Sequence, residues 1–259
     1  MELTEREFSA SLGVREDTLS DTEKQRLDKD DFLIFPDIFD ADTVQQLREA
    51  FERVIDTKSL HATAIPGLLE EGARRVQYCE HKDPAFDRCY IQPKVLSAVW
   101  HVFQRPFHLA TVCGRDPQQG HGIQPLHADA GPTKNRDVVA VQTFFMLDDF
   151  TPDNGAPRVV PGALHCADQR WEGSTADHPE QVLVTGSAGS VAVINSHLYH
   201  NGTRNNNGKH RRTLHVSYAT RTLLPHDEVH CHQNYIDQET YDRISPGARV
   251  ILNVTDPAV

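Results

Sequence analysis

The second half of the chain carries a series of short β-prone segments that glycine and proline turns separate, with no helical pattern between them. Segments rich in Val, Ile, Thr and aromatic residues are typical of strands. Strands are expected near residues 108–113, 122–127, 138–147, 158–160, 181–185, 190–195 and 212–220. Because parallel strands need crossover helices, the pattern predicts an antiparallel jelly roll rather than alternating βαβ units.

The first hundred residues have a different character. Residues 32–35 (FLIF) precede Pro36 and predict a short buried strand, and another strand is expected near 75–78. Amphipathic helices are predicted over 41–56, with Asp40 as N-cap, and over 93–103. We therefore expect one domain over residues 1–259: mostly helical cover and first strands in 1–105, a jelly-roll core in 106–222, and a tail in 223–259.

Composition narrows the class of partner. The 259 residues include 26 basic and 37 acidic ones, a formal net charge of −11 that disfavours nucleic acid and anionic membranes as partners. No apolar run is long enough to span a bilayer, and the charged start predicts no secretory signal. Five cysteines without C-x-x-C spacing indicate reduced thiols, as in a cytoplasmic protein.

A metal-ligand pattern follows the expected strand at 122–127. His127 and Asp129 are two residues apart, so on a strand their side chains leave the same face. His200 follows the strand expected at 190–195. Two imidazoles and one carboxylate are the facial triad of non-heme Fe(II) oxygenases. Arg211 lies eleven residues after His200, which leaves enough chain for a turn and a return strand. Its guanidinium fork matches the geometry of a carboxylate, which indicates a carboxylate co-substrate beside the metal.

With these residues in place, the core resembles the phytanoyl-CoA dioxygenase family of Fe(II)/2-oxoglutarate oxygenases over about residues 30–220. The similarity rests on FLIFPDIFDADTVQQLREAFERV, His127-Ala128-Asp129, Leu147-Asp148-Asp149, Asn154-Gly155-Ala156, Pro161-Gly162-Ala163-Leu164-His165, His200 and Arg211. Ala163 stands where relatives often carry Ser, which leaves the role of His165 open. The resemblance implies a mainly β fold with flanking helices, a double-stranded β-helix (a cupin-like, jelly-roll barrel).

The resemblance also implies roles. His127, Asp129 and His200 would ligate Fe(II), and Arg211 would hold the distal carboxylate of 2-oxoglutarate. Gln124 and Thr143, or Gln142 in place of Thr143, would be further co-substrate contacts. O2 would be the second co-substrate, and succinate and CO2 would be products. Chlorinating relatives replace the ligand carboxylate with a small residue, so Asp129 favours hydroxylation, desaturation or ring closure.

Several alternatives stay open at this point. Arg212 competes with Arg211, and strand alternation separates them because Arg211 shares a face with polar residues and Arg212 with apolar ones. Other histidines could replace a ligand or contribute to the site: His121, His165, His197 and His215, whereas His230 and His232 are interpreted as surface residues.

The expected function is oxidation, above all hydroxylation, of an unactivated C–H of a small molecule in secondary metabolism. The net charge and the short basic clusters Arg74-Arg75 and Lys209–Arg212 disfavour an acyl-CoA substrate and mildly favour an amine-bearing one. Gln77 and Arg221 are candidate substrate contacts. The alternatives are a cupin-like metal-dependent isomerase or hydrolase, and a non-catalytic jelly-roll binding protein. The sequence leaves the oligomeric state undetermined.

Overall fold

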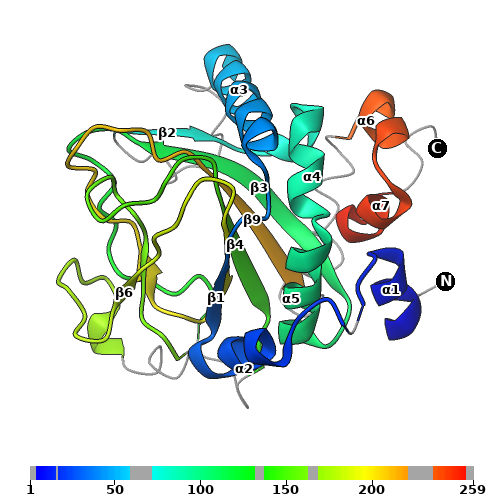
Figure 1. Ribbon diagram of the computed structural model, residues 1–259, viewed down its shortest axis with the longest axis horizontal. Coiled ribbons are helices and arrows are strands. Elements are labelled where there is room, and N and C mark those ends of the chain that lie inside the picture. Colours follow the sequence, from blue (N-terminus) through cyan, green and yellow to red (C-terminus); the bar gives the residue numbers. More distant parts are fainter. Residues whose placement is uncertain are drawn as a thin grey trace.

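Two antiparallel sheets form the centre of the computed structural model, which describes residues 4–15, 17–58, 72–131, 137–162, 169–220 and 236–254. The larger sheet has six strands in the order β1-β7-β4-β9-β3-β2 (Figure 1). These strands are β1 (Phe32–Phe35), β2 (Ala73–Val76), β3 (Phe107–Pro117), β4 (Ala140–Met146), β7 (Val191–Asn195) and β9 (Thr213–Thr220). The smaller sheet contains β5 (Arg158–Val159), β6 (Val182–Leu183) and β8 (His200–Asn201).

Helices cover one face of the larger sheet. They are α1 (Glu5–Ser11), α2 (Asp21–Asp30), α3 (Ala41–Lys58), α4 (Asp87–Tyr90), α5 (Pro93–Phe103), α6 (Gln238–Arg243) and α7 (Pro246–Leu252), with short 3-10 turns at Cys79–His81, Pro84–Phe86 and Gln169–Trp171. Helices α1, α6 and α7 lie together at one side of the molecule (Figure 1). This mainly β arrangement with flanking helices confirms the predicted jelly-roll fold class, although the described strands do not close into one continuous barrel.

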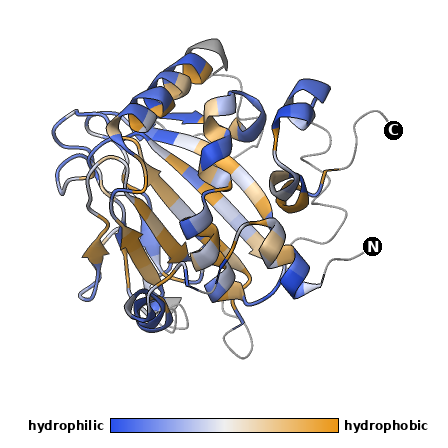
Figure 2. Ribbon diagram, turned by 45° about the vertical axis from the view of Figure 1, so that its right-hand side comes forward, coloured by the Kyte–Doolittle hydropathy of each residue, from blue (hydrophilic) through white to orange (hydrophobic). Residues whose placement is uncertain are grey.

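Alternation along the strands separates two apolar layers. One face of the larger sheet presents residues such as Val141, Phe145 and Val216 to Leu47 and Phe51 of α3 in the main core. The other face carries a smaller cluster, which includes Phe144, Met146, Phe150, Val159, Ala192 and Ile194. Figure 2 shows hydrophobic residues concentrated along the strands, with hydrophilic ones on α2 and the loops. Because strand side chains alternate, neighbouring residues of β4 belong to different layers.

Local chemistry explains where the predicted helices begin. The carboxylate of Asp40 accepts the Thr43 backbone N–H at 2.8 Å, which confirms the predicted cap of α3. Helix α5 matches its predicted bounds because Gln92 caps the Val95 N–H at 2.9 Å and Pro93 occupies the first helical position. None of the helices in the described ranges is both long and apolar enough to cross a membrane.

The prediction of a strand over residues 122–127 is wrong. The structure has only an isolated antiparallel bridge there, between His127 and His200. Pro125 lacks an N–H to donate, and Gly122 adopts a φ of +105°, so a regular ladder cannot run through this segment. Strand β2 also begins and ends earlier than expected, at Ala73 and Val76.

Candidate metal centre and co-substrate site

A pair of backbone hydrogen bonds places two of the predicted ligands side by side. The N–H of His127 donates to the carbonyl of His200 at 3.1 Å, and the N–H of His200 donates to the carbonyl of His127 at 2.8 Å. Strand β8 holds His200 in this position because it also pairs with Val159 of β5. The two imidazole rings consequently lie with their centroids 4.6 Å apart.

The carboxylate of Asp129 completes the cluster. One oxygen lies 3.6 Å from His127 Nε2, and the other lies 3.5 Å from His200 Nε2. One ligand atom from each residue can be chosen so that all lie within 4.8 Å of one another. The side chains of His127 and Asp129 remain 34% and 32% exposed, whereas that of His200 is 9% exposed, so the cluster opens to solvent on one side.

Both imidazoles are oriented for metal binding in the same way. His127 Nδ1 lies 2.8 Å from the carbonyl oxygen of Pro125, and His200 Nδ1 lies 3.0 Å from that of Leu198. A carbonyl only accepts, so each Nδ1 carries the proton and each Nε2 presents its lone pair. Such a partner at the second ring nitrogen is the usual device for fixing a histidine ligand. The donor set and its orientation fit a divalent metal with open positions.

Two further residues orient Asp129. Gln142 Nε2 donates to Asp129 Oδ2 at 2.8 Å, and Ser217 Oγ donates to Gln142 Oε1 at 2.6 Å. Gln142 and Ser217 are direct partners in the β4–β9 register, so the sheet itself builds this chain of hydrogen bonds. Sequence reasoning weighed Gln142 as an alternative and missed Ser217, whose only signal was its place on the polar face of β9.

Asp129 and His200 stabilise each other's charged forms, whereas the two imidazoles oppose each other. Burial opposes ionisation of Asp129, but the nearby His200 imidazole outweighs it and lowers the pKa of Asp129. Burial likewise opposes protonation of His200, yet Asp129 raises the pKa of His200 above 6.5. Burial and the charge of His200 lower the pKa of His127. The exposed carboxylate of Glu172, which sequence reasoning also missed, acts in the raising direction on both imidazoles.

The two candidate arginines lie in different environments. Arg211 is fully buried, and its guanidinium lies 5.0 Å from the centroid of the Phe150 ring, in the apolar layer away from the helices. Arg212 instead forms ion pairs with Asp148 and Glu52, each at 2.9 Å. Alternation thus separates the pair as the sequence pattern predicts.

The half-buried ring of His215 relates Arg211 to the candidate metal-ligand cluster. Burial lowers the pKa of His215 well below 6.5; the positive charge of Arg211 acts in the same direction, and Asp129 opposes it. Arg211 and Asp129 are therefore both within electrostatic reach of one ring.

The two other predicted co-substrate contacts lie apart from each other. Thr143 faces the helix layer, where its hydroxyl donates to the carbonyl of Val216 at 2.9 Å, and the structure does not bring it together with the triad. Gln124 is nearer: its side-chain oxygen accepts the N–H of Gly202 at 3.2 Å, in the loop that follows His200.

Of the remaining candidates, those that the structure describes do not join the cluster. His197 accepts the Val139 N–H at 3.2 Å through Nε2, and its Nδ1 lies 2.8 Å from the carbonyl of Gly131, so both ring nitrogens are engaged. His121 is exposed and Gln77 is buried. His165, Arg221, His230 and His232 lie outside the described residues.

Solved structures with the same fold include metalloenzymes. HygX from Streptomyces hygroscopicus, solved with nickel, 2-oxoglutarate and hygromycin B, is 19% identical, with a TM-score of 0.61 and coverage of 78% of this chain and 88% of that one. SnoK, a non-heme α-ketoglutarate-dependent carbocyclase from nogalamycin biosynthesis, is 19% identical, with a TM-score of 0.64 and coverage of 78% and 84%.

Among curated proteins, the dioxygenase olcK of Penicillium canescens is 33% identical over 107 residues, which are 38% of this chain and 34% of that protein. The chain thus aligns with about a third of the length of the curated relatives it matches. A family model covers far more: that of phytanoyl-CoA dioxygenase (PhyH) matches residues 27–213, which include the triad and Arg211. The chain belongs to the phytanoyl-CoA dioxygenase (PhyH) family.

Proposed function

We propose that this protein is an Fe(II)- and 2-oxoglutarate-dependent dioxygenase that oxidises an unactivated C–H of a small molecule, in the first place by hydroxylation. The observation that carries the proposal is the convergence of His127, Asp129 and His200, each with a ligand atom within 4.8 Å of the others. Membership of a dioxygenase family supports the same reaction class. Structural neighbours include a carbocyclase and an epimerase, so other outcomes of C–H oxidation are compatible with the fold.

The protein contributes orientation and shielding. His127, Asp129 and His200 would hold the iron and leave positions open for 2-oxoglutarate and O2. Iron with these co-substrates supplies the oxidising chemistry, with succinate and CO2 as by-products. Arg211 would bind the distal carboxylate of 2-oxoglutarate through its guanidinium fork. The apolar side chains of Phe144, Met146 and Phe150 line the layer beside Arg211, and they would limit the access of water.

For the substrate, we propose a small molecule of secondary metabolism. HygX was solved with hygromycin B, and SnoN with a nogalamycin compound, so this fold accommodates natural products of considerable size. Asp129 would place a carboxylate on the metal. Chlorinating enzymes of this type lack that carboxylate, and halide binds the metal in its place. We therefore expect oxygenation chemistry rather than halogenation.

The test is calorimetric titration of 2-oxoglutarate into the Mn(II)-loaded protein. We expect the wild type and Arg212→Ala to bind 2-oxoglutarate. Arg211→Ala should lose about 2–4 kcal/mol of binding free energy, because a buried charged partner of the co-substrate is removed. Asp129→Ala should lose metal affinity and co-substrate turnover, measured as succinate release.

The same experiment separates the alternatives. A metal-binding isomerase or hydrolase would bind Mn(II) without responding to 2-oxoglutarate, and a non-catalytic jelly-roll protein would release no succinate when loaded with iron. Either result in the wild type would contradict the proposal.

A further inference from the structure

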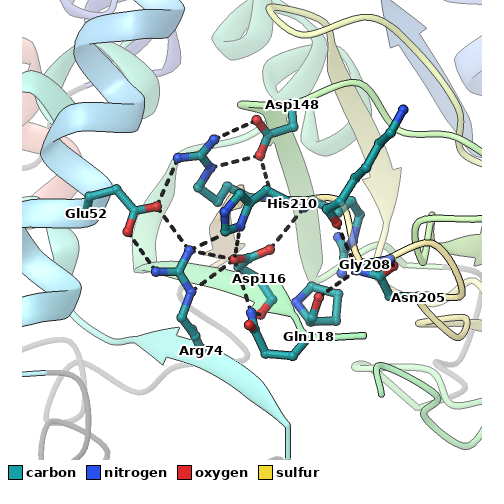
Figure 3. A network of polar contacts seen from close by, with 12 residues as sticks. Glu52, Arg74, Asp116, Gln118, Asp148, Asn205, Gly208 and His210 are labelled. Atoms are coloured by element: carbon teal, nitrogen blue, oxygen red, sulfur yellow. Dashed lines mark hydrogen bonds and ion pairs between the residues drawn. The ribbon is translucent and has the colours of Figure 1, made fainter. Parts of the chain in front are cut away.

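A network of charged side chains, shown in Figure 3, contacts the backbone of Arg211 and Arg212 just before β9. It joins α3, β2, β3 and the segments around β4 and β9. Its members are Arg48, Glu52, Arg74, Asp116, Asp148, His210 and Arg212. Glu52 of α3 is the bridge, because its carboxylate accepts from Arg74 at 2.7 and 3.0 Å and from Arg212 at 2.9 Å.

Asp116 is the fully buried carboxylate of this network. Its Oδ2 accepts from Arg74 at 3.0 and 2.6 Å and lies 2.9 Å from His210 Nδ1. These contacts hold the carboxylate in one orientation. Its Oδ1 is thereby aimed at the main chain, where it accepts the backbone N–H of Arg211 at 3.0 Å.

On the β3 side the ladder has ended before it reaches Arg211, whereas on the β4 side the N–H of Leu147 still donates to the carbonyl of Arg212 at 3.0 Å. The β3–β9 pairing stops at Arg115 and Thr213. Before Thr213, two carboxylates take over: Asp116 accepts the N–H of Arg211, and Asp148 accepts the N–H of Arg212 at 2.8 Å. Consecutive amides are therefore each bound by a different acidic side chain.

The consequence is a choice between two adjacent arginines. A shift by one residue exchanges the faces of every side chain in a strand, so a slip here would turn Arg212 inward and Arg211 towards the helices. The outer position offers Glu52 and Asp148, which would attract either guanidinium. Side-chain charge alone therefore does not decide which arginine enters the inner layer. Contacts to the backbone do: the N–H of Leu147 donates to the Arg212 carbonyl, and Asp116 accepts the Arg211 N–H.

We propose that Asp116 is a positioning residue for co-substrate binding: by accepting the Arg211 backbone N–H, it holds the chain just before β9 in the register that turns the Arg211 guanidinium into the inner layer. The inference rests on the proposed function, in which Arg211 binds the distal carboxylate of 2-oxoglutarate. Asp116 itself contacts neither the metal ligands nor the co-substrate in this scheme.

The test compares Asp116→Ala and Asp116→Asn with Asp87→Asn. Asp87 is a matched control, because its carboxylate pairs with Arg243 at 3.0 Å and its side chain is 18% exposed, away from the triad. Asp116→Ala should raise the Kd for 2-oxoglutarate in Mn(II)-loaded protein, and the KM for 2-oxoglutarate in iron-loaded protein, about tenfold or more, as loss of a supporting contact does. Metal affinity should stay at the wild-type value. Asp116→Asn keeps an acceptor oxygen for the Arg211 N–H, so its affinity for 2-oxoglutarate should fall by less.

A double-mutant comparison separates positioning from general weakening. If Asp116 acts through Arg211, then adding Asp116→Ala to Arg211→Lys should raise the KM by far less than it does in the wild type. Hydrogen exchange at the Arg211 amide should accelerate in Asp116→Asn and not in Asp87→Asn.

The possible outcomes remain distinct. Wild-type co-substrate affinity in both Asp116 variants, or equal losses of metal and co-substrate affinity, would overturn the inference. Failure of the wild type itself to bind 2-oxoglutarate would overturn the proposed function, and the exchange measurement would still report whether Asp116 holds this amide.

Discussion

Gln142 and Thr143 are neighbours on β4, yet they serve different layers of the molecule. Gln142 donates to Asp129 in the metal-ligand cluster, and Thr143 donates to the backbone of Val216 beneath the helices. A strand alternates its faces, so only one of two successive residues can reach the site. These two adjacent polar side chains, one half-buried and one buried, therefore point to opposite faces of the sheet and can be compared directly by mutation.

Gln142→Met should weaken metal binding about tenfold, because Asp129 loses the hydrogen bond that orients it. Thr143→Val should leave metal binding unchanged and lower the free energy of unfolding by about 1 kcal/mol through the lost hydrogen bond. Mn(II) titration and urea unfolding of both variants check this. Equal metal affinities in the two variants would show that the Gln142 contact does not support the site.

At the scale of elements, the loop after β8 approaches the 122–127 segment closely. Gly202 accepts a hydrogen bond from the Gln124 N–H at 3.1 Å and donates to the Gln124 side chain at 3.2 Å. A Cβ at Gly202 would lie 2.4 Å from the carbonyl oxygen of Gly122. This close approach keeps the two histidine-bearing segments paired, so the geometry of the candidate metal site depends on a residue with no side chain.

Gly202→Ala should therefore lower the free energy of unfolding by about 1–3 kcal/mol, the usual range for overpacking. It should also reduce Mn(II) affinity, since the segments carrying His127 and His200 must separate. Gly131→Ala is the control, because a Cβ there meets nothing within 4 Å. Urea unfolding with parallel metal titrations measures both effects, and unchanged metal affinity in a destabilised Gly202→Ala would contradict the second expectation.

At the scale of the whole molecule, the network around Asp116 ties the helical cover to the larger sheet. Burial opposes ionisation of Asp116, but the hydrogen bonds from Arg74, the Arg211 backbone and His210 outweigh it and lower the pKa of Asp116. Glu52 of α3 also has a lowered pKa, first through its hydrogen bond with Arg74. A carboxylate whose pKa is lowered by folding stabilises the folded state at pH values above its unfolded-state pKa. This contribution is lost as the pH falls through the folded-state pKa.

Asp116→Asn should therefore cost about 2–3 kcal/mol of unfolding free energy near neutral pH, in line with hydrogen bonds to a charged group. The difference from wild type should shrink as the pH falls below the ordinary Asp value of 3.8, because the wild-type carboxylate also becomes neutral. Urea unfolding across that pH range measures the difference. Glu49→Gln, on the exposed face of α3, should show no such dependence. A constant gap at every pH would mean that charge at Asp116 is not the source of the stability.

Local patterns in the sequence determined most of the elements and identified the candidate ligand set. Helix α5 and strand β1 match their predicted bounds. The spacing of apolar residues, the N-cap and the prolines that set these bounds all act within a few residues of the chain. His127, Asp129 and His200 were named from residue type and spacing, and Arg211 was separated from Arg212 by alternation, which is also a local property.

Only the tertiary structure decided the contacts between distant segments. It replaced the expected strand at 122–127 by a single bridge to His200 and placed Gln142 rather than Thr143 beside Asp129. It also placed Asp116 on the Arg211 amide. The physical reason is that hydrophobic periodicity and secondary-structure propensity determine which face of a segment packs against the rest of the protein. Which neighbour it meets depends on packing of the whole chain, and that choice creates the hydrogen bonds that orient the site.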